Sequence, residues 1–227
     1  MAGRCSAQLV EPPVAATMAQ PFSIDLRVTI SRGSGPPRFT ISITISPARW
    51  AIAQLERNLD EIGEPHPALE LGLRWLRRNE PHAPKNLTLL HGDYRLGNMM
   101  VNEQGLVSVL DWEFAHIGDP YEDITWSLVR DWRFGNDHLY FCGIAPPDEF
   151  FGAYERAMGV TIDHAKVRYW EVMGNVRWAV GMLNQAQRHL SGEELNLEFA
   201  SLGRRCAELE LEVMRLIRNE RRMTNAE

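Results

Sequence analysis

The sequence predicts an α+β fold that is mostly helical, and three observations support this prediction. Residues 47–227 contain several stretches in which apolar residues recur with a period near 3.6, which is typical of amphipathic helices. Short apolar runs separated by polar loops lie between residues 87 and 110 and predict strands. Residues 39–46 alternate apolar and polar side chains, the pattern of a half-buried strand. We therefore divide the chain into an irregular segment, 1–46, with one or two possible strands, and a mainly helical domain, 47–227.

Composition and charge narrow the class of protein. The chain has 227 residues, of which 44% are hydrophobic and 24% charged, as in ordinary globular proteins. Its formal charge of −6 argues against nucleic acid as a main partner, because backbone phosphates require a basic surface. No apolar run approaches the roughly 20 residues of a membrane span, and we expect no membrane partner.

The three cysteines, Cys5, Cys142 and Cys206, are too few and too widely spaced to predict a disulfide framework or a zinc cluster. Glu11 and two prolines interrupt the first apolar residues, so no signal peptide is predicted and we expect a cytoplasmic protein.

Six helices are expected, over residues 49–62, 67–79, 120–128, 148–158, 163–190 and 193–220. Asp163 is a typical N-cap residue, and Ser191 and Gly192 end the helix that follows it. Residues 130–147 are rich in aromatic residues, glycine and proline, which predicts a long loop. The last helix carries apolar residues at steps of three and four, which predicts core packing: Leu195, Phe199, Leu202, Cys206, Leu209, Val213, Leu216 and Ile217.

Three short strands are expected at residues 87–91, 99–102 and 106–110. The first strand leads into a polar loop, HGDYRLGN, and the third into an acidic segment, DWEFAHIGDPYED. If the three strands pair with one another, both polar segments lie on the same side of the sheet. The sequence therefore predicts a polar site built from these two segments.

Three oxygen-bearing side chains stand out in the two segments. Asn98 follows Asp93 by five residues, and Asp111 follows Asn98 by 13 residues at the end of an apolar strand. Two carboxylates and one amide oxygen form a set of hard ligands suited to Mg²⁺. A single Asp or Asn commonly caps a turn, but an ordered set with these gaps favours a site.

The pattern H-G-D-x-x-x-x-N, followed by D-W-E and G-D-P-x-x-D, resembles the aminoglycoside phosphotransferase and choline kinase family. That family has a protein-kinase-like fold, and the step from Asp to Asn is the same as in the protein-kinase catalytic loop. The resemblance covers residues 48–220, the C-terminal lobe. It implies transfer of a phosphoryl group from ATP, with GTP as an alternative, to the hydroxyl group of a small molecule, with Mg²⁺ as the metal.

The resemblance implies a role for each residue of the predicted site. Asp93 would accept the proton of the acceptor hydroxyl and orient it for attack. His91, placed with Asp93 in the catalytic pair, would pack against the loop and hydrogen-bond it. Asn98 and Asp111 would bind Mg²⁺ and, through it, the nucleotide phosphates.

The flanking polar residues are expected to support this site. Glu113 would lie near the metal, bracing the site or contacting the substrate. Asp119 and Asp123 would brace the catalytic loop through its backbone N–H groups. Arg95 would contact a phosphate or lie on the surface, and His116 would be a ligand or a structural histidine.

The N-terminal lobe of the family is not evident in the sequence. It comprises on the order of 100 residues and supplies a lysine that pairs with the nucleotide phosphates. Only 46 residues precede the helical domain here, and the first lysine of the chain is Lys85. Residues 33–35 resemble a glycine loop, but Arg38 stands where a third glycine is required. We therefore expect a truncated chain that is inactive alone, with an exposed lobe interface that favours self-association.

The acceptor is not identified by the sequence. A group of tryptophans in the helical lobe predicts either core packing or an aromatic wall that holds a cationic substrate: Trp126, Trp132, Trp170 and Trp178. Two alternative functions remain open at this point. One is a non-catalytic C-terminal lobe that binds a ligand or partner, and the other is a metal-dependent hydrolase that uses the acidic cluster with His91 and His116.

Overall fold

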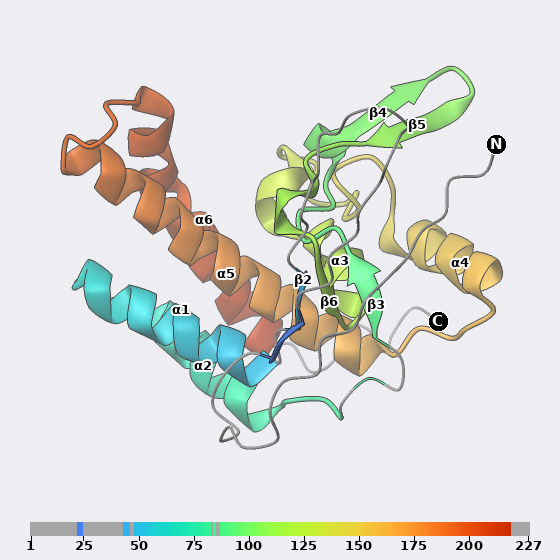
Figure 1. Cartoon of the computed structure of the whole chain (residues 1–227), viewed down its shortest axis with the longest axis horizontal. Helices are drawn as coiled ribbons and strands as arrows, with labels where there is room; N and C mark the ends of the chain where they lie inside the picture. The colour runs from blue at the N-terminus through green and yellow to red at the C-terminus, as the bar shows by residue number, and fades with distance from the viewer. Residues whose placement is uncertain (1–21, 25–42, 46–47, 83, 85–86, 219–227) are drawn as a thin grey trace, which may run out of the picture.

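The computed structural model describes residues 22–24, 43–45, 48–82, 84 and 87–218 (Figure 1). Six helices are found in these residues: α1 (Ala48–Ile62), α2 (Pro67–Arg78), α3 (Tyr121–Trp126), α4 (Pro147–Met158), α5 (His164–Leu190) and α6 (Leu197–Arg218). The strands are β1 (Phe22–Ile24), β2 (Ile43–Ile45), β3 (Thr88–Leu90), β4 (Met99–Asn102), β5 (Gly105–Val109) and β6 (His116–Gly118). The predicted α+β class, mostly helical, is confirmed.

Helix α5 is the centre of the helical part. It is buried on most of its circumference between Val167 and Ala186, because α1, α2, α3 and α6 all pack against it. Figure 1 shows α6 along the length of α5, with α1 and α2 on the same side of the molecule. Asp163 caps α5 as predicted, since its Oδ1 accepts hydrogen bonds from the amides of Ala165 at 2.9 Å and Lys166 at 3.3 Å. Apolar side chains of these helices form the main core, including Ile52, Leu69, Leu73, Val172, Val176, Leu209 and Val213.

The strands form two sheets rather than the single set expected from the sequence. The first sheet has the order β1-β2-β6-β3, and its only parallel pair is β2 with β6. The second sheet is the β4–β5 hairpin, which projects away from the helices (Figure 1). The predicted pairing of residues 87–91 with the other two strands is therefore wrong.

The partner of β3 explains this difference. Leu90 is buried and β3 pairs antiparallel with β6, with Leu89 opposite Ile117. The sequence does not predict β6, because three residues of His-Ile-Gly show no strand periodicity. The β4–β5 hairpin closes locally over two residues, 103 and 104, which keeps the entropic cost of its pairing low.

Two other predictions differ from the structure in detail. One or two strands were expected in residues 1–46, one of them at 39–46, and the structure has β1 and β2 in this segment; residues 25–42 and 46 lie outside the described residues. The last helix begins at Leu197 rather than at residue 193, because the side chain of Asn196 accepts a hydrogen bond from the amide of Glu198 at 2.9 Å and caps it. Leu195 consequently lies in the preceding turn and is 81% exposed.

A buried ionic cluster connects α5, α6 and the turn at Arg130–Arg133. The guanidinium of Arg133, 1% exposed, donates to the carboxylates of Glu171 and Glu212, each at 3.1 Å, and to the carbonyl of Leu128 at 2.8 and 3.1 Å. Burial raises the pKa of Glu171 to about 7, and the charge of Arg133 opposes that rise. Every charged group of this cluster is paired within the protein.

No helix in the described part of the chain is long and apolar enough to cross a membrane.

Candidate active site

The polar loop between β3 and β4 is fixed by the ring of His91. One ring nitrogen, Nδ1, accepts a hydrogen bond from the amide of Asp93 at 3.1 Å, and the other, Nε2, lies 2.6 Å from the carbonyl oxygen of Leu110. An imidazole with its proton on Nε2 satisfies both contacts. His91 is 2% exposed and connects the loop to the end of β5, directly before Asp111. Its ring therefore positions the two polar segments relative to each other.

The start of the same loop is held by α3. The carboxylate of Asp123 accepts hydrogen bonds from the amides of His91 at 2.6 Å and Gly92 at 2.8 Å. This is the bracing contact expected for Asp123 from the sequence. Gly92 has a φ of 82°, and a β-carbon at this position would overlap the backbone oxygen of Phe114. Only glycine combines this left-handed backbone with so close an approach.

The carboxylate of Asp93 is held by three donors. Oδ1 accepts a hydrogen bond from Trp126 Nε1 at 2.7 Å, and Oδ2 accepts one from Asn98 Nδ2 at 2.7 Å. The Nε of Arg95 lies within 3.1–3.2 Å of both oxygens. The Asp93 side chain is 15% exposed, so hydrogen bonds from these three side chains replace most of its contacts with water. The carboxylate group is therefore held in one orientation.

The predicted metal ligands lie on adjacent parts of the backbone. Asn98 is 2% exposed, and its carbonyl accepts a hydrogen bond from the amide of Leu110 at 2.8 Å, which places Asp111 next to Asn98 across the strands. Asp111 is exposed and adopts a left-handed conformation, with φ of 61° and ψ of 58°. Asp tolerates this conformation better than most residues. The structure thus brings the chain at Asn98, Asp93 and Asp111 together, although the predicted three-strand pairing is wrong.

Asp119 has a different place from the one expected. Its carboxylate caps the start of α3 by accepting from the amide of Tyr121 at 3.1 Å, and it forms an ion pair with Lys166 Nζ at 3.1 Å. The loop amides are bound by Asp123 instead, because Asp119 precedes α3 and Asp123 lies within its first turn. Glu113 is exposed, in the short turn between Asp111 and β6.

A cleft of about 710 Å³ opens beside Asp93. Its walls come from α1, α3, α5, the loop between β3 and β4, and residues 113–116. Of the predicted site residues, Asp93, Arg95 and Glu113 line it, whereas Asn98 and Asp111 are not among its lining residues. Asp93 lines the cleft and contacts Asn98, so it connects the cleft to one of the two predicted metal ligands.

The tryptophans of the helical lobe border the same site. The ring centres of Trp126 and Trp132 lie 5.9 Å apart, and those of Trp132 and Trp178 lie 4.9 Å apart. The guanidinium of Arg95 lies 4.9 Å from the Trp132 ring, and that of Arg177 lies 4.9 Å from the Trp126 ring. Trp126 thus contributes both an aromatic face and the hydrogen bond to Asp93. The sequence indicated the aromatic residue but not the bond.

His116 and Glu122 form a pair in the cleft wall that was not predicted. His116 Nε2 lies 3.1 Å from Glu122 Oε2, and its Nδ1 lies 2.9 Å from the carbonyl oxygen of Phe114. Burial lowers the pKa of His116, but these two oxygen acceptors outweigh burial, so its pKa is raised. Both ring nitrogens of His116 thus lie against oxygen atoms of the described residues.

Arg177 was also missed from the sequence. It lies in α5, where the surrounding apolar periodicity suggests a core helix, and it lines the cleft with Asp93. Burial lowers the pKa of Arg177, and the nearby carboxylates of Glu122, Asp93 and Asp123 oppose this effect. A basic residue inside a strongly apolar helix face is the signal that would have identified it.

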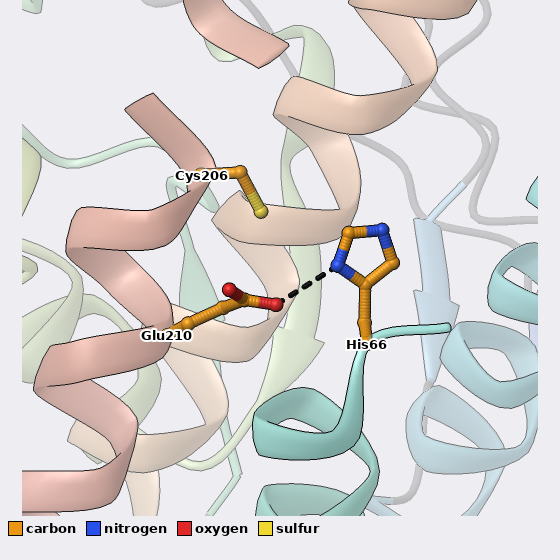
Figure 2. Close-up of side chains that lie close together, drawn as sticks. All are labelled: His66, Cys206 and Glu210. Atoms are coloured by element: carbon orange, nitrogen blue, oxygen red, sulfur yellow. Dashed lines mark hydrogen bonds and ion pairs between the residues drawn. The ribbon is translucent and has the colours of Figure 1, made fainter. Parts of the chain in front are cut away.

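A second group of potential ligands lies away from the cleft. His66, Cys206 and Glu210 place a nitrogen, a sulfur and an oxygen within 4.8 Å of one another, and Figure 2 shows them between the start of α2 and α6. His66 Nδ1 already bonds Glu210 Oε1 at 2.8 Å, and burial raises the pKa of the Cys206 thiol to about 12. The thiol is packed in the main core, and we assign the group to contact between the two helices.

Comparison with known proteins gives matches that agree with this geometry. A model of the family described as "Phosphotransferase enzyme family" (APH) matches residues 27–170, more than half of the chain. The match crosses the boundary predicted between residues 46 and 47. A crystal structure from Ralstonia eutropha JMP134, described as a candidate aminoglycoside phosphotransferase, is 22% identical, with a TM-score of 0.61. It covers 75% of this chain and 55% of that one, and at this identity it shows a shared fold.

Two curated relatives match a shorter region. Acyl-CoA dehydrogenase family member 10 of Mus musculus is 30% identical over 105 residues, which are 41% of this chain and 10% of that protein. Acyl-CoA dehydrogenase family member 11 of Homo sapiens is 33% identical over 103 residues, which are 41% of this chain and 13% of that protein. The matched region is thus about a tenth of the length of these relatives. With the family match, the shared fold and the loop geometry taken together, the chain belongs to the phosphotransferase enzyme family.

Proposed function

We propose that this protein transfers the terminal phosphoryl group of ATP, with GTP as an alternative donor, to the hydroxyl group of a small molecule. Asp93 accepts the hydroxyl proton while the hydroxyl oxygen forms its bond to phosphorus. The bond from phosphorus to the leaving oxygen breaks, and the nucleoside diphosphate departs. Such a transfer requires little covalent help from the protein, and it depends on positioning and on stabilisation of charge.

The environment of Asp93 carries this proposal. Trp126, Asn98 and Arg95 hold the carboxylate at the wall of a cleft large enough for a small molecule. A carboxylate fixed in this way can orient a hydroxyl group for attack without paying for reorganisation at the moment of reaction. A surface Asp that only caps a turn would need none of these three side-chain donors.

The residues beside Asp93 fit a divalent magnesium ion. The Nδ2 of Asn98 is bound to the carbonyl and carboxylate of Asp93, at 2.9 and 2.7 Å, which leaves its Oδ1 as the ligand atom. Asp111 presents an exposed carboxylate next to it along the backbone. These are the hard oxygen donors that Mg²⁺ selects, and we propose that Asn98 and Asp111 hold it. When bound, the ion would neutralise charge on the nucleotide phosphates.

Arg95 completes the proposed site. Its Nε binds the Asp93 carboxylate, and Gly97 gives the guanidinium room, because a β-carbon there would overlap Arg95 Nη1. The side chain is 31% exposed, so it retains freedom to move. We propose that Arg95 turns from Asp93 towards the transferring phosphate when substrates bind, which frees the carboxylate for the hydroxyl proton.

The test is transfer of labelled phosphate from Mg²⁺·ATP to a panel of hydroxyl compounds, with Asp93→Asn as the central variant. Transfer by the 227-residue chain would also contradict the expectation that it is inactive alone. We expect the rate to fall about 10²- to 10⁴-fold, the usual contribution of a positioned acid or base. Asp148→Asn makes the same change at an exposed position in α4 and should leave the rate unchanged. Transfer by Asp93→Asn at the unaltered rate would contradict the role of Asp93.

Calorimetric titration with Mg²⁺·ATP tests the metal ligands separately. We expect binding that Asp111→Asn weakens, because the amide cannot supply the lost charge. Binding of nucleotide or ligand without transfer would favour a non-catalytic binding module. Release of free phosphate that needs no acceptor would favour the hydrolase.

A further inference from the structure

Arg177 holds a positive charge in the cleft, one side chain away from Asp93. Its guanidinium lies 4.9 Å from the ring centre of Trp126, and the indole Nε1 of Trp126 donates to Asp93 Oδ1 at 2.7 Å. Arg177 and Asp93 both line the cleft of about 710 Å³. A molecule that presents a hydroxyl group to Asp93 would therefore have Arg177 within its reach.

Arg177 has no hydrogen bond or ion pair with any residue that the structure describes, although the carboxylates of Glu122, Asp93 and Asp123 lie near enough to act on its charge. Each of these carboxylates is engaged elsewhere. Asp123 binds two backbone amides, Glu122 lies against His116, and Asp93 is held by its own three donors. Removing a cation from water without a hydrogen-bonded counter-charge is unfavourable, so a bound anion would satisfy this arginine.

The cations that lie over the tryptophan rings also favour a negatively charged ligand in the cleft. A tryptophan face can hold a cationic ligand, which was one expectation for this wall. In the structure Arg177 covers the face of Trp126 and Arg95 that of Trp132, each at 4.9 Å. The protein's own cations already occupy these faces, and a cationic acceptor would meet two guanidinium groups there.

We propose that Arg177 binds an anionic group of the acceptor, a carboxylate or a phosphate, while the acceptor's hydroxyl group lies at Asp93. The acceptor class would then be hydroxy acids or hydroxyalkyl phosphates rather than amino alcohols or aminosugars. The inference rests on the proposed function for the identity of the reaction. The anion site itself can be tested without turnover.

The first experiment measures binding through thermal unfolding of the full chain. Four probes share one carbon skeleton and a hydroxyl group: hydroxybutyrate, hydroxybutyl phosphate, butanediol and aminobutanol. We expect one or both anionic probes to raise the melting temperature, and butanediol and aminobutanol to leave it unchanged, because only a ligand that binds the native state stabilises it. The response to carboxylate against phosphate identifies which anion the site takes.

The matched variants are Arg177→Met, which keeps the apolar stem on Trp126, and Arg188→Met, which removes a charge from the same helix near its exposed end. Arg177→Met should abolish the shift, Arg188→Met should retain it, and Arg177→Lys should restore part of it. No shift with either anion, a shift with aminobutanol, or an equal shift in Arg177→Met would overturn the proposal.

The second experiment separates this inference from the proposed function. For an accepted anionic substrate, Arg177→Met should raise the KM for the acceptor at least about 10-fold, as expected for loss of a charged hydrogen bond, and leave the KM for ATP unchanged. Asp93→Asn should lose transfer but keep the melting shift with the anionic probes. A shift in melting temperature that depends on Arg177, with no phosphoryl transfer to any acceptor, would support the anion site and contradict the proposed kinase activity. An increase in the KM for ATP alone would place Arg177 at the nucleotide and overturn the proposal.

Discussion

Arg133 and Arg177 are two arginines that the fold removes from bulk water in opposite ways. Arg133 lies in the ionic cluster of α5 and α6, where two carboxylates and a carbonyl receive its N–H groups. Arg177 lies in the cleft wall, and within the described residues it has only the face of Trp126. We call a charge closed when groups of the protein satisfy its hydrogen bonds, as they do for Arg133, which stabilises the fold. We call a charge open when it lacks such partners among the described residues, as Arg177 does, and an open charge can bind a ligand.

The acidic residues of the site show the same contrast. Asp123 is closed, since both of its oxygens accept hydrogen bonds from backbone amides of the loop between β3 and β4. Asp111 is open, exposed at the end of β5 in a left-handed conformation. Asp123 therefore holds the frame of this site, whereas the carboxylate of Asp111 is accessible to a metal or a substrate.

The largest expected effect concerns the closed cation. Arg133→Met leaves the buried carboxylate of Glu171 without its paired charge, while Glu212 keeps Arg130 and Arg215 as partners. Loss of one partner of a buried pair costs about 3–5 kcal/mol of unfolding free energy. Chemical denaturation of the wild type and the variant measures this loss. Arg74→Met removes an exposed charge paired with Glu70 and should change stability by less than about 0.5 kcal/mol. Equal losses of stability in the two variants would contradict the predicted difference between the buried Arg133 and the exposed Arg74.

A smaller loss is expected for the closed anion. Asp123→Asn replaces a charged acceptor of two backbone amides by a neutral group that can accept through one oxygen only. We expect a loss of about 1.5–3 kcal/mol, measured by chemical denaturation. Asp111→Asn is the matched control, since Asn tolerates the left-handed backbone and Asp111 is exposed. It should change stability by about 0.5 kcal/mol or less.

The ionic cluster also predicts a dependence of stability on pH. The pKa of Glu171 is about 7 in the folded protein, raised by burial from an ordinary value of 4.5. Between these two values the folded state binds more protons than the unfolded state, so this group's contribution to stability falls as pH rises through the interval. Its slope is at most about 1.4 kcal/mol per pH unit.

Glu171→Gln should remove this contribution, and the measurement is the difference between the two stability curves from pH 4.5 to 7. The raised pKa of His116 acts in the same direction, but it is present in both proteins and cancels from the difference. Parallel curves would show that the pKa of Glu171 is the same in the folded and unfolded states.

The smallest expected effect is a gain in stability rather than a loss, and it tests the contrast between Arg177 and Arg133 directly. Arg177→Met should raise the unfolding free energy of the ligand-free protein by about 1 kcal/mol, because it removes a desolvated charge that has no hydrogen-bonded partner among the described residues. Thermal and chemical denaturation measure the change. A loss as large as that of Arg133→Met would mean that Arg177 is a closed charge as well.

Local patterns predicted much of this molecule. The periodicity of α1, α2 and α5, the cap at Asp163 and the loop between β3 and β4 all depend on neighbours in the sequence, and all were found. The pairing of β3 with β6 was not predicted, because β6 is three residues long and its pairing depends on distant segments. The start of α6 was misplaced by four residues, since the cap at Asn196 competes with the apolar periodicity.

The order of Asp93, Asn98 and Asp111, with their spacing, is a property of the sequence by itself, and so is the mainly helical class. Only the tertiary structure decided which charges are closed and which are open. Asp119 and Asp123 stand four residues apart in one motif, yet Asp119 caps a helix and binds Lys166 while Asp123 holds the loop between β3 and β4. Arg133 and Arg177 are likewise the same type of residue, and residue type alone does not distinguish their surroundings. The free energy of a buried charge depends on the partners that the fold brings within hydrogen-bonding distance, and those partners come from distant parts of the chain.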